Sequence, residues 1–238
     1  MERHRIHENF SQEMLDGLQN ICNNPRYSDN NSKAKDMLFL LKDYGFTEIG
    51  PGTNRLTVRS VDYVYKIAMD SFGVRDNWNE FNMSPKAQPY VTKTYECNGL
   101  IAVAEYVNLI TKQEFKDSLS NIKNMLEILA QDYIFCDMGL IEKNMLNFGF
   151  RDDGSLVVLD FGYLYPIDRK IMFCKKCGAR LQWDSLFTNL VCTKCGKKHD
   201  PIEIRDRMWK SESSFDPDRT KYDKESDKNG ILQIDIGW

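Results

Sequence analysis

The sequence has no run of about 18 consecutive apolar residues, the length that a transmembrane helix needs. It also shows no internal repeat and no N-terminal signal-peptide pattern. We therefore expect neither a membrane span nor an oxidising compartment, and we predict a cytoplasmic protein with reduced cysteines. The 238 residues are enough for a buried core and a small additional module.

Four of the seven cysteines form two Cys-x-x-Cys pairs, Cys174 with Cys177 and Cys192 with Cys195, and a glycine follows each pair. This spacing is typical of a zinc ribbon, in which four thiolates hold one Zn²⁺ tetrahedrally. Disulfides are the weaker alternative, because the other three cysteines are scattered. His199 is a substitute ligand, but four cysteines already complete the tetrahedron. We therefore predict a structural zinc without an open catalytic position.

The predicted ribbon is basic, because Asp184 is the one acidic residue among many lysines and arginines between residues 169 and 198. A basic ribbon with Trp183 and Phe187 nearby can bind nucleic acid. The alternative is that the lysines offset the thiolate charge and cover a solvated face. We consider nucleic acid a less favoured partner than a protein.

A second pattern consists of four residues in short characteristic contexts. Lys66 lies in a Val/Tyr/Ile-rich strand segment, and Glu80 lies in a short segment with helical character. Asn144 follows Glu142-Lys143, and Asp160 opens Asp160-Phe161-Gly162 after an apolar run. Each context alone also fits an ordinary edge strand, solvated helix or turn, so their conjunction and order carry the prediction.

These residue types suit an anionic nucleotide. A lysine on a strand can hold phosphates when a glutamate on a neighbouring helix fixes its ammonium group. Magnesium prefers oxygen ligands, which an aspartate and an asparagine carbonyl supply. Lys66 and Glu80 fit the first pair of roles, and Asn144 and Asp160 fit the second.

In that order, the four contexts resemble the nucleotide-binding elements of the protein-kinase-like superfamily over residues 46–165. The resemblance implies ATP and Mg²⁺ as cofactors and an α+β, two-lobed kinase-like fold. The small lobe would have five antiparallel strands and one helix, and the large lobe would be abbreviated and mainly helical. The expected strands are residues 46–49, 54–60, 61–69, 90–96 and 100–107, with a helix over 76–83 and a hairpin turn at Asn98-Gly99.

The resemblance assigns further nucleotide contacts. Gly50, Gly52 and Asn54 would form a phosphate loop, and Glu105 to Val107 would form the hinge that holds adenine through backbone groups. The loop departs from the family, because Arg55 stands in place of its third glycine. An ordinary hairpin turn is therefore the alternative, although Asn54 and Arg55 could still reach a phosphate.

The catalytic loop departs too. In the motif His-Arg-Asp-x-x-x-x-Asn, the base aligns with Gly139, and the nearest acid on that side is Asp137, preceded by Phe135-Cys136 rather than His-Arg. Either a longer loop lets Asp137 act as the base, or the base is absent. No Ala-Pro-Glu follows Gly162. A reduced prokaryotic or phage-type protein fits this better than an ordinary eukaryotic-type kinase.

Outside these motifs, helical periodicity predicts helices over residues 8–22, 33–44 and 111–133, and Asp152-Asp153-Gly154 predicts a turn. The expected organisation is an N-terminal helical brace (1–45), a small lobe (46–107), an abbreviated large lobe (108–168), a zinc ribbon (169–200) and a C-terminal helix and tail (201–238). Residues 211–230 are polar, and the apolar residues 231–238 either return to the body or dock on a partner.

Two functions follow. The first is an ATP·Mg-dependent phosphotransferase acting on a protein or small-molecule hydroxyl, with Asp137, Lys66, Asn144 and Asp160 as its catalytic set. The second is a weak or inactive pseudokinase that serves as a binding module through its ribbon and tail. The imperfect glycine loop and the displaced Asp137 favour the second, and the retained set of four favours the first.

Overall fold

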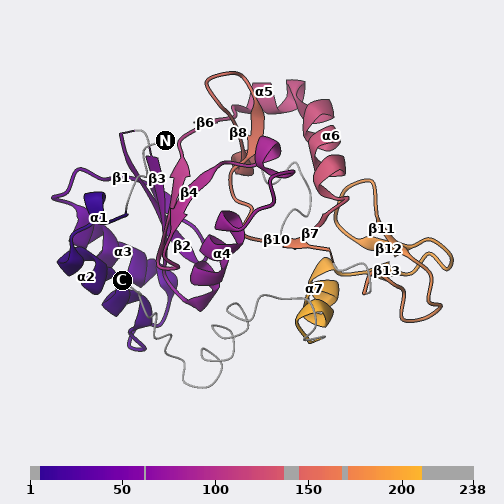
Figure 1. Ribbon diagram of the computed structural model, residues 1–238, viewed down its shortest axis with the longest axis horizontal. Coiled ribbons are helices and arrows are strands. Elements are labelled where there is room, and N and C mark those ends of the chain that lie inside the picture. Colours follow the sequence, from indigo (N-terminus) through magenta and orange to yellow (C-terminus); the bar gives the residue numbers. More distant parts are fainter. Residues whose placement is uncertain (1–5, 62, 137–144, 168–170, 211–238) are drawn as a thin grey trace. The chain divides into compact units, whose positions relative to one another are not determined.

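The computed structural model describes four stretches of the chain, residues 6–61, 63–136, 145–167 and 171–210 (Figure 1). The fold is mixed α+β with antiparallel sheets, as predicted. The described residues divide into two compact units: residues 6–84 with Thr92–Tyr106, and Pro85–Val91 with residues 107–210. Within these stretches, no helix is long and apolar enough to cross a membrane.

The first unit is built on a five-stranded antiparallel sheet with the order β1-β2-β3-β5-β4. Its strands are β1 (Thr47–Pro51), β2 (Arg55–Ser60), β3 (Tyr63–Ala68), β4 (Thr94–Cys97) and β5 (Ile101–Glu105). Helix α4 (Ser71–Phe81) separates β3 from β4 in the chain. The predicted succession of three strands, a helix and two strands is therefore confirmed. The Asn98-Gly99 hairpin is also present, with Gly99 at φ 86°.

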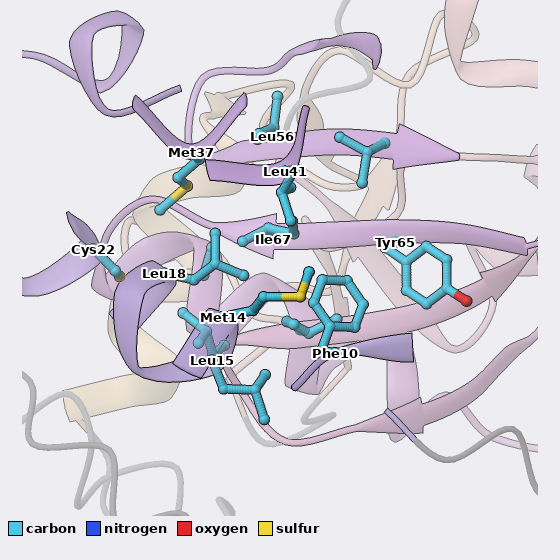
Figure 2. Packing of buried hydrophobic residues seen from close by; sticks show 14 of the residues in the cluster. Phe10, Met14, Leu15, Leu18, Cys22, Met37, Leu41, Leu56, Tyr65 and Ile67 are labelled. Atoms are coloured by element: carbon cyan, nitrogen blue, oxygen red, sulfur yellow. The ribbon is translucent and has the colours of Figure 1, made fainter. Parts of the chain in front are cut away.

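Three N-terminal helices cover one face of this sheet: α1 (Ile6–Asn9), α2 (Gln12–Asn23) and α3 (Asn30–Leu41). Their apolar side chains and those of the central strands form one buried core, shown in Figure 2. In that core, Phe10 stacks on Phe46 with ring centroids 5.0 Å apart, and Tyr65 meets Phe10 edge-on at 5.2 Å. The N-terminal helices are thus part of the same core as the sheet.

The opposite face of the sheet is polar where it meets α4. Because successive side chains of a strand point to opposite faces, Tyr65 and Ile67 join the apolar core while Lys66 between them faces α4. Arg55 on β2 points the same way. The strand alternation therefore brings two cations to the helix.

Helix α4 begins five residues earlier than predicted. Asp70 caps it, since its carboxylate accepts a hydrogen bond of 2.8 Å from the backbone N–H of Gly73. An aspartate at this position satisfies an otherwise unpaired donor of the first turn. The cap is fixed in turn by Asn30, whose amide nitrogen lies 2.6 Å from the Asp70 carboxylate.

Three other predicted helices differ in extent. The helix predicted over 33–44 is α3, which begins and ends three residues earlier. The helix predicted over 8–22 is split into α1 and α2, because Ser11 leaves the helical path and caps α2 at Met14 N–H. The helix predicted over 111–133 is split at Ser118 into α5 (Lys112–Asp117) and α6 (Leu119–Leu129). After α6 the chain turns, and strand β7 (Tyr133–Phe135) begins at the last residue of the predicted helix.

The second unit contains two small antiparallel sheets besides these helices. One has the order β6-β8-β9, and the other pairs β7 with β10. Their bounds are β6 (Asn108–Leu109), β8 (Phe148–Phe150), β9 (Leu156–Val158) and β10 (Leu164–Pro166). The predicted turn joins β8 to β9, with Gly154 at φ 83°. Short 3₁₀ turns occupy Gln88–Tyr90 and Met145–Asn147.

The remainder of the second unit is a three-stranded antiparallel sheet followed by a helix. The strands are β11 (Leu181–Trp183), β12 (Leu190–Cys192) and β13 (Lys198–His199), and the helix is α7 (Pro201–Lys210). Ile134 of β7, Tyr165 of β10 and Ile204 of α7 share one buried cluster with the cysteine-bearing segment. The part of the chain predicted as a separate ribbon therefore shares a core with β7 and β10.

Gly73 offers a direct test of the contact between α4 and the β1–β2 turn. A Cβ atom there would lie 2.3 Å from the backbone oxygen of Asn54, whereas a Cβ at the helical Gly17 would meet only the flexible end of Leu40. We predict that Gly73→Ala lowers the free energy of unfolding by about 1–3 kcal/mol through overpacking. Gly17→Ala, the matched control, should be neutral or stabilising by up to about 1 kcal/mol. Urea unfolding of both variants measures this, and equal effects would contradict it.

Candidate functional site

The centre of the first unit's polar face is an ion cluster of three buried side chains. The Glu80 carboxylate accepts a hydrogen bond of 2.6 Å from Lys66 Nζ through Oε2 and one of 2.8 Å from Arg55 through Oε1. The side chain of Glu80 is 0 % exposed, and those of Arg55 and Lys66 are 7 % and 9 % exposed. One carboxylate is therefore shared by two cations from neighbouring strands.

The pair of Lys66 and Glu80 was predicted from the sequence, but the role of Arg55 was not. Arg55 was expected beside the glycine turn, near the start of the strand predicted over residues 54–60, where it could still reach a phosphate. It does lie in β2, and its guanidinium is bonded to Glu80 and, at 3.3 Å, to Asn77 Oδ1. The sequence signal was the alternation of Arg55 and Arg59 with apolar residues, which places both arginines on one strand face.

Helix α4 is unusual in burying consecutive polar residues. Asp76, Asn77, Asn79 and Glu80 are all 3 % exposed or less. Asn77 donates from its amide nitrogen to the backbone oxygens of Lys66 at 3.1 Å and Gly99 at 2.8 Å. These bonds tie α4 to β3 and to the β4–β5 hairpin, so the helix that carries Glu80 is fixed against the strand that carries Lys66.

The predicted phosphate loop is the tight turn between β1 and β2. Gly50 and Pro51 belong to β1, and Gly52 N–H donates to Arg55 O at 2.8 Å to close the turn. The Asn54 side chain lies toward Asp76, with Nδ2 3.4 Å from its carboxylate. Phosphate contacts from Gly50, Gly52 and Asn54 stay a prediction.

At the predicted hinge, Glu105 ends β5 and is bonded to Lys93 twice. Its backbone N–H donates to Lys93 O at 2.9 Å, and its carboxylate accepts from Lys93 N–H at 2.7 Å. Val107 is buried in the second unit. Adenine binding at these positions also stays a prediction.

Of the predicted magnesium and base residues, only Asp160 lies among the described residues, since Asp137 and Asn144 fall outside them. Asp160 follows β9 in the second unit and is exposed, while the next two residues are buried. Phe161 is 1 % exposed, and its backbone oxygen accepts from Leu164 N–H at 2.9 Å. In this turn Phe161 is buried and Asp160 is an exposed residue.

The four predicted zinc ligands converge. The sulfur atoms of Cys174, Cys177, Cys192 and Cys195 all lie within 4.8 Å of one another. The separations are 3.7 Å between Cys174 and Cys195 and 3.4 Å between Cys177 and Cys192. Zn–S bonds of about 2.3 Å place the sulfurs of a tetrahedron about 3.8 Å apart. The group can therefore hold a metal, and its geometry is compatible with zinc.

The backbone around the cysteines suits anionic sulfur. The N–H groups of Cys195 and Lys194 each lie 3.4 Å from Cys192 Sγ. The hydrogen bond from Cys195 N–H is the largest cause of a lowered pKa at the Cys192 thiol, which falls to about 6. The glycines after both pairs have positive φ, 70° at Gly178 and 67° at Gly196, as the sequence implied. His199 is buried and not among the converging ligands; its Nδ1 lies 3.4 Å from Arg207.

Comparison with known proteins does not assign this chain to a family. No protein-family model matches it, and a search of the curated proteins finds no significant match. The function has to be argued from the ion cluster, the Asp160 turn and the cysteine group.

The ion cluster predicts a large difference between two glutamates. Glu80→Ala leaves two buried cations without their carboxylate, which costs about 3–5 kcal/mol. Glu203→Ala is the control, because Glu203 also binds an arginine at 2.8 Å but its side chain is 50 % exposed. The control should cost about 1 kcal/mol or less. Comparable losses in urea unfolding would show that the buried cluster is not a special element of the fold.

The cysteine group predicts one zinc ion per chain, measured by elemental analysis of the purified protein. Cys192→Ala should lose the metal, since three thiolates bind zinc more weakly than four. Cys97→Ala should keep it, because burial raises the pKa of Cys97 to about 12 and its thiol stays protonated. Metal retained in Cys192→Ala, or lost in Cys97→Ala, would contradict the assignment.

Proposed function

We propose that this protein is an ATP·Mg-binding, kinase-like protein that transfers phosphate to a protein or small-molecule hydroxyl. The observation that carries the proposal is the buried cluster of Lys66, Glu80 and Arg55. Glu80 holds Lys66 Nζ at 2.6 Å and the Arg55 guanidinium at 2.8 Å through one buried carboxylate. A lysine ammonium fixed in this way can bind a phosphate oxygen, and a phosphate group is the anion that Lys66 would meet in a kinase-like protein.

A second buried acid of α4 has a cation of its own nearby. Asp76 lies one helical turn before Glu80, and its Oδ1 lies 3.6 Å from the Arg75 guanidinium. Glu80 holds Lys66 and Arg55, and a lysine held in this way can take part in binding a triphosphate.

In the proposed reaction, Lys66 orients the phosphates and Glu80 holds the Lys66 ammonium in place. Asp160 and Asn144 would hold Mg²⁺, which neutralises charge on the phosphates when bound. Asp137 would accept the proton of the attacking hydroxyl. The exposure of Asp160, next to the buried Phe161, supports its part in this assignment.

We further propose that the four cysteines bind Zn²⁺ as a structural ion. All four ligand positions are filled by protein sulfurs, so the ion has no open position for a substrate. Its role would be to order residues 174–195, whose strands are too short to form a core alone.

The alternative function is a pseudokinase that binds nucleotide without transferring phosphate. One observation favours it. Arg55 stands where the family has a flexible glycine, and it is buried and bonded to Glu80 and Asn77. This residue stiffens the strand after the turn, so the turn has less freedom to close over phosphates.

Thermal unfolding of zinc-loaded protein with ATP, with and without Mg²⁺, tests the proposal. At about 100 times its Kd, ATP should stabilise the fold by about 2.7 kcal/mol, or roughly 5–10 °C. We predict that Mg²⁺ strengthens this shift in wild type and not in Asp160→Ala. Asp153→Ala, another exposed aspartate of the second unit, should behave as wild type.

Lys66→Met should lose most of the shift even with Mg²⁺, while Arg55 still pairs with Glu80 and preserves the fold. Radiolabelled phosphate transfer then separates the two functions: magnesium-dependent binding without transfer would support the pseudokinase. A nucleotide shift that is equal in wild type, Asp160→Ala and Lys66→Met would refute both.

A further inference from the structure

The ribbon contributes an aromatic side chain to the strand pair that adjoins the Asp160 turn. Trp183 of β11 stacks on Phe135 of β7, with ring centroids 5.2 Å apart and an interplanar angle of 23°. Phe187 closes the group, with its ring 5.8 Å from Phe135 and 6.3 Å from Trp183. All three residues belong to the second unit.

Phe135 is connected directly to the Asp160 turn. It pairs with Leu164 in the β7–β10 ladder, and Leu164 N–H donates to Phe161 O at 2.9 Å. One residue further, Cys136 N–H donates to Tyr163 O at 3.2 Å. The backbone that leaves the turn after Asp160, at Tyr163 and Leu164, is thus held by β7, and Phe135 of β7 is in turn stacked on Trp183.

The same cluster reaches the metal ligands. Ile134 and Tyr165 of the β7–β10 pair are buried together with Cys174 and Cys192. Trp183 lies in β11, whose neighbour β12 ends at Cys192. The stacked ring is therefore carried on the strands that the cysteine group orders.

The Trp183 indole nitrogen is a buried donor whose hydrogen bond is missing among the described residues. Nε1 is buried and has no hydrogen-bond acceptor among the described residues. A buried unpaired donor is unfavourable, so the benefit of this side chain must come from its ring and not from its N–H group.

From these contacts we infer that Trp183 is a positioning residue for the Asp160 turn, acting through Phe135 and the β7–β10 pair. This inference rests on the proposed function, in which Asp160 binds Mg²⁺. The ribbon then does more than bind zinc, since it sets the orientation of the proposed magnesium ligand from a segment distant in sequence.

Three substitutions test this inference. Trp183→Phe keeps a stacking ring and removes the unpaired N–H, so it should match wild type. Trp183→Ala and Trp183→Leu both remove the stacking, and Trp183→Leu keeps apolar bulk should the alanine variant not fold. Leu186→Ala is the control, because Leu186 is 49 % exposed in the same β11–β12 connection.

Hydrogen exchange gives the readout that does not depend on nucleotide. In Trp183→Leu, amides of residues 133–136 and 161–166 should exchange at least tenfold faster than in wild type, with zinc content and exchange in the first unit unchanged. Unchanged exchange in these two segments would overturn the inference, as would equal acceleration throughout both units.

ATP affinity gives the second readout. Trp183→Leu should lose at least tenfold of the magnesium-dependent gain in ATP affinity, while affinity without Mg²⁺, which depends on Lys66 and Glu80, should not change. Should wild type bind no ATP, the proposed function fails, and hydrogen exchange still decides the positioning role. A full magnesium gain in Trp183→Leu would overturn that role even if exchange is faster.

Discussion

The Glu80 carboxylate is the group on which the first unit depends. It accepts hydrogen bonds from Arg55 on β2 and Lys66 on β3, and α4 carries it into a site where its side chain has no exposure. Burial of three charged groups is unfavourable unless each is paired, so the positions of two strands and a helix are linked through one side chain. The capped start of α4 at Asp70 and the amide bonds of Asn77 hold the helix in register with this pair. The shared carboxylate holds the Lys66 ammonium in a fixed position, and that fixed cation is the physical basis for proposing a phosphate ligand.

In the second unit, the corresponding constraint is the cysteine group. The strands around it have three residues or fewer, too few to form a core without a metal or a neighbour. They have a neighbour, because the cluster of Ile134, Tyr165 and Ile204 joins them to β7, β10 and α7, and their four cysteines can hold a metal. A segment that looks like an appended module in the sequence therefore shares its interior with the strands beside the Asp160 turn.

The sequence predicted those features that depend on local pattern. The succession of strands and helix along the chain, the Asn98-Gly99 hairpin and the convergence of the four cysteines follow from alternation, turn residues and ligand spacing. It failed where tertiary contacts decide: the bond between Arg55 and Glu80 was missed because the two residues are 25 positions apart in the chain, and the helix over 111–133 ends early because residues 133–135 pair with β10. The stacking of Trp183 on Phe135 could not be predicted for the same reason. Asp137 and Asn144 lie outside the described residues, so their roles rest on the sequence alone.

The most direct test of the central claim compares the affinities of ATP and adenosine, by calorimetry in the presence of Mg²⁺, for wild type and Lys66→Met. Both ligands share the adenine and ribose groups, so the difference isolates the contribution of the phosphates. We expect ATP to bind wild type at least 100-fold more tightly than adenosine, and the ratio to fall at least tenfold in Lys66→Met with adenosine affinity unchanged. An equal ratio in the two proteins would mean that the buried cluster of Lys66, Glu80 and Arg55 supports the fold alone and takes no part in binding phosphate.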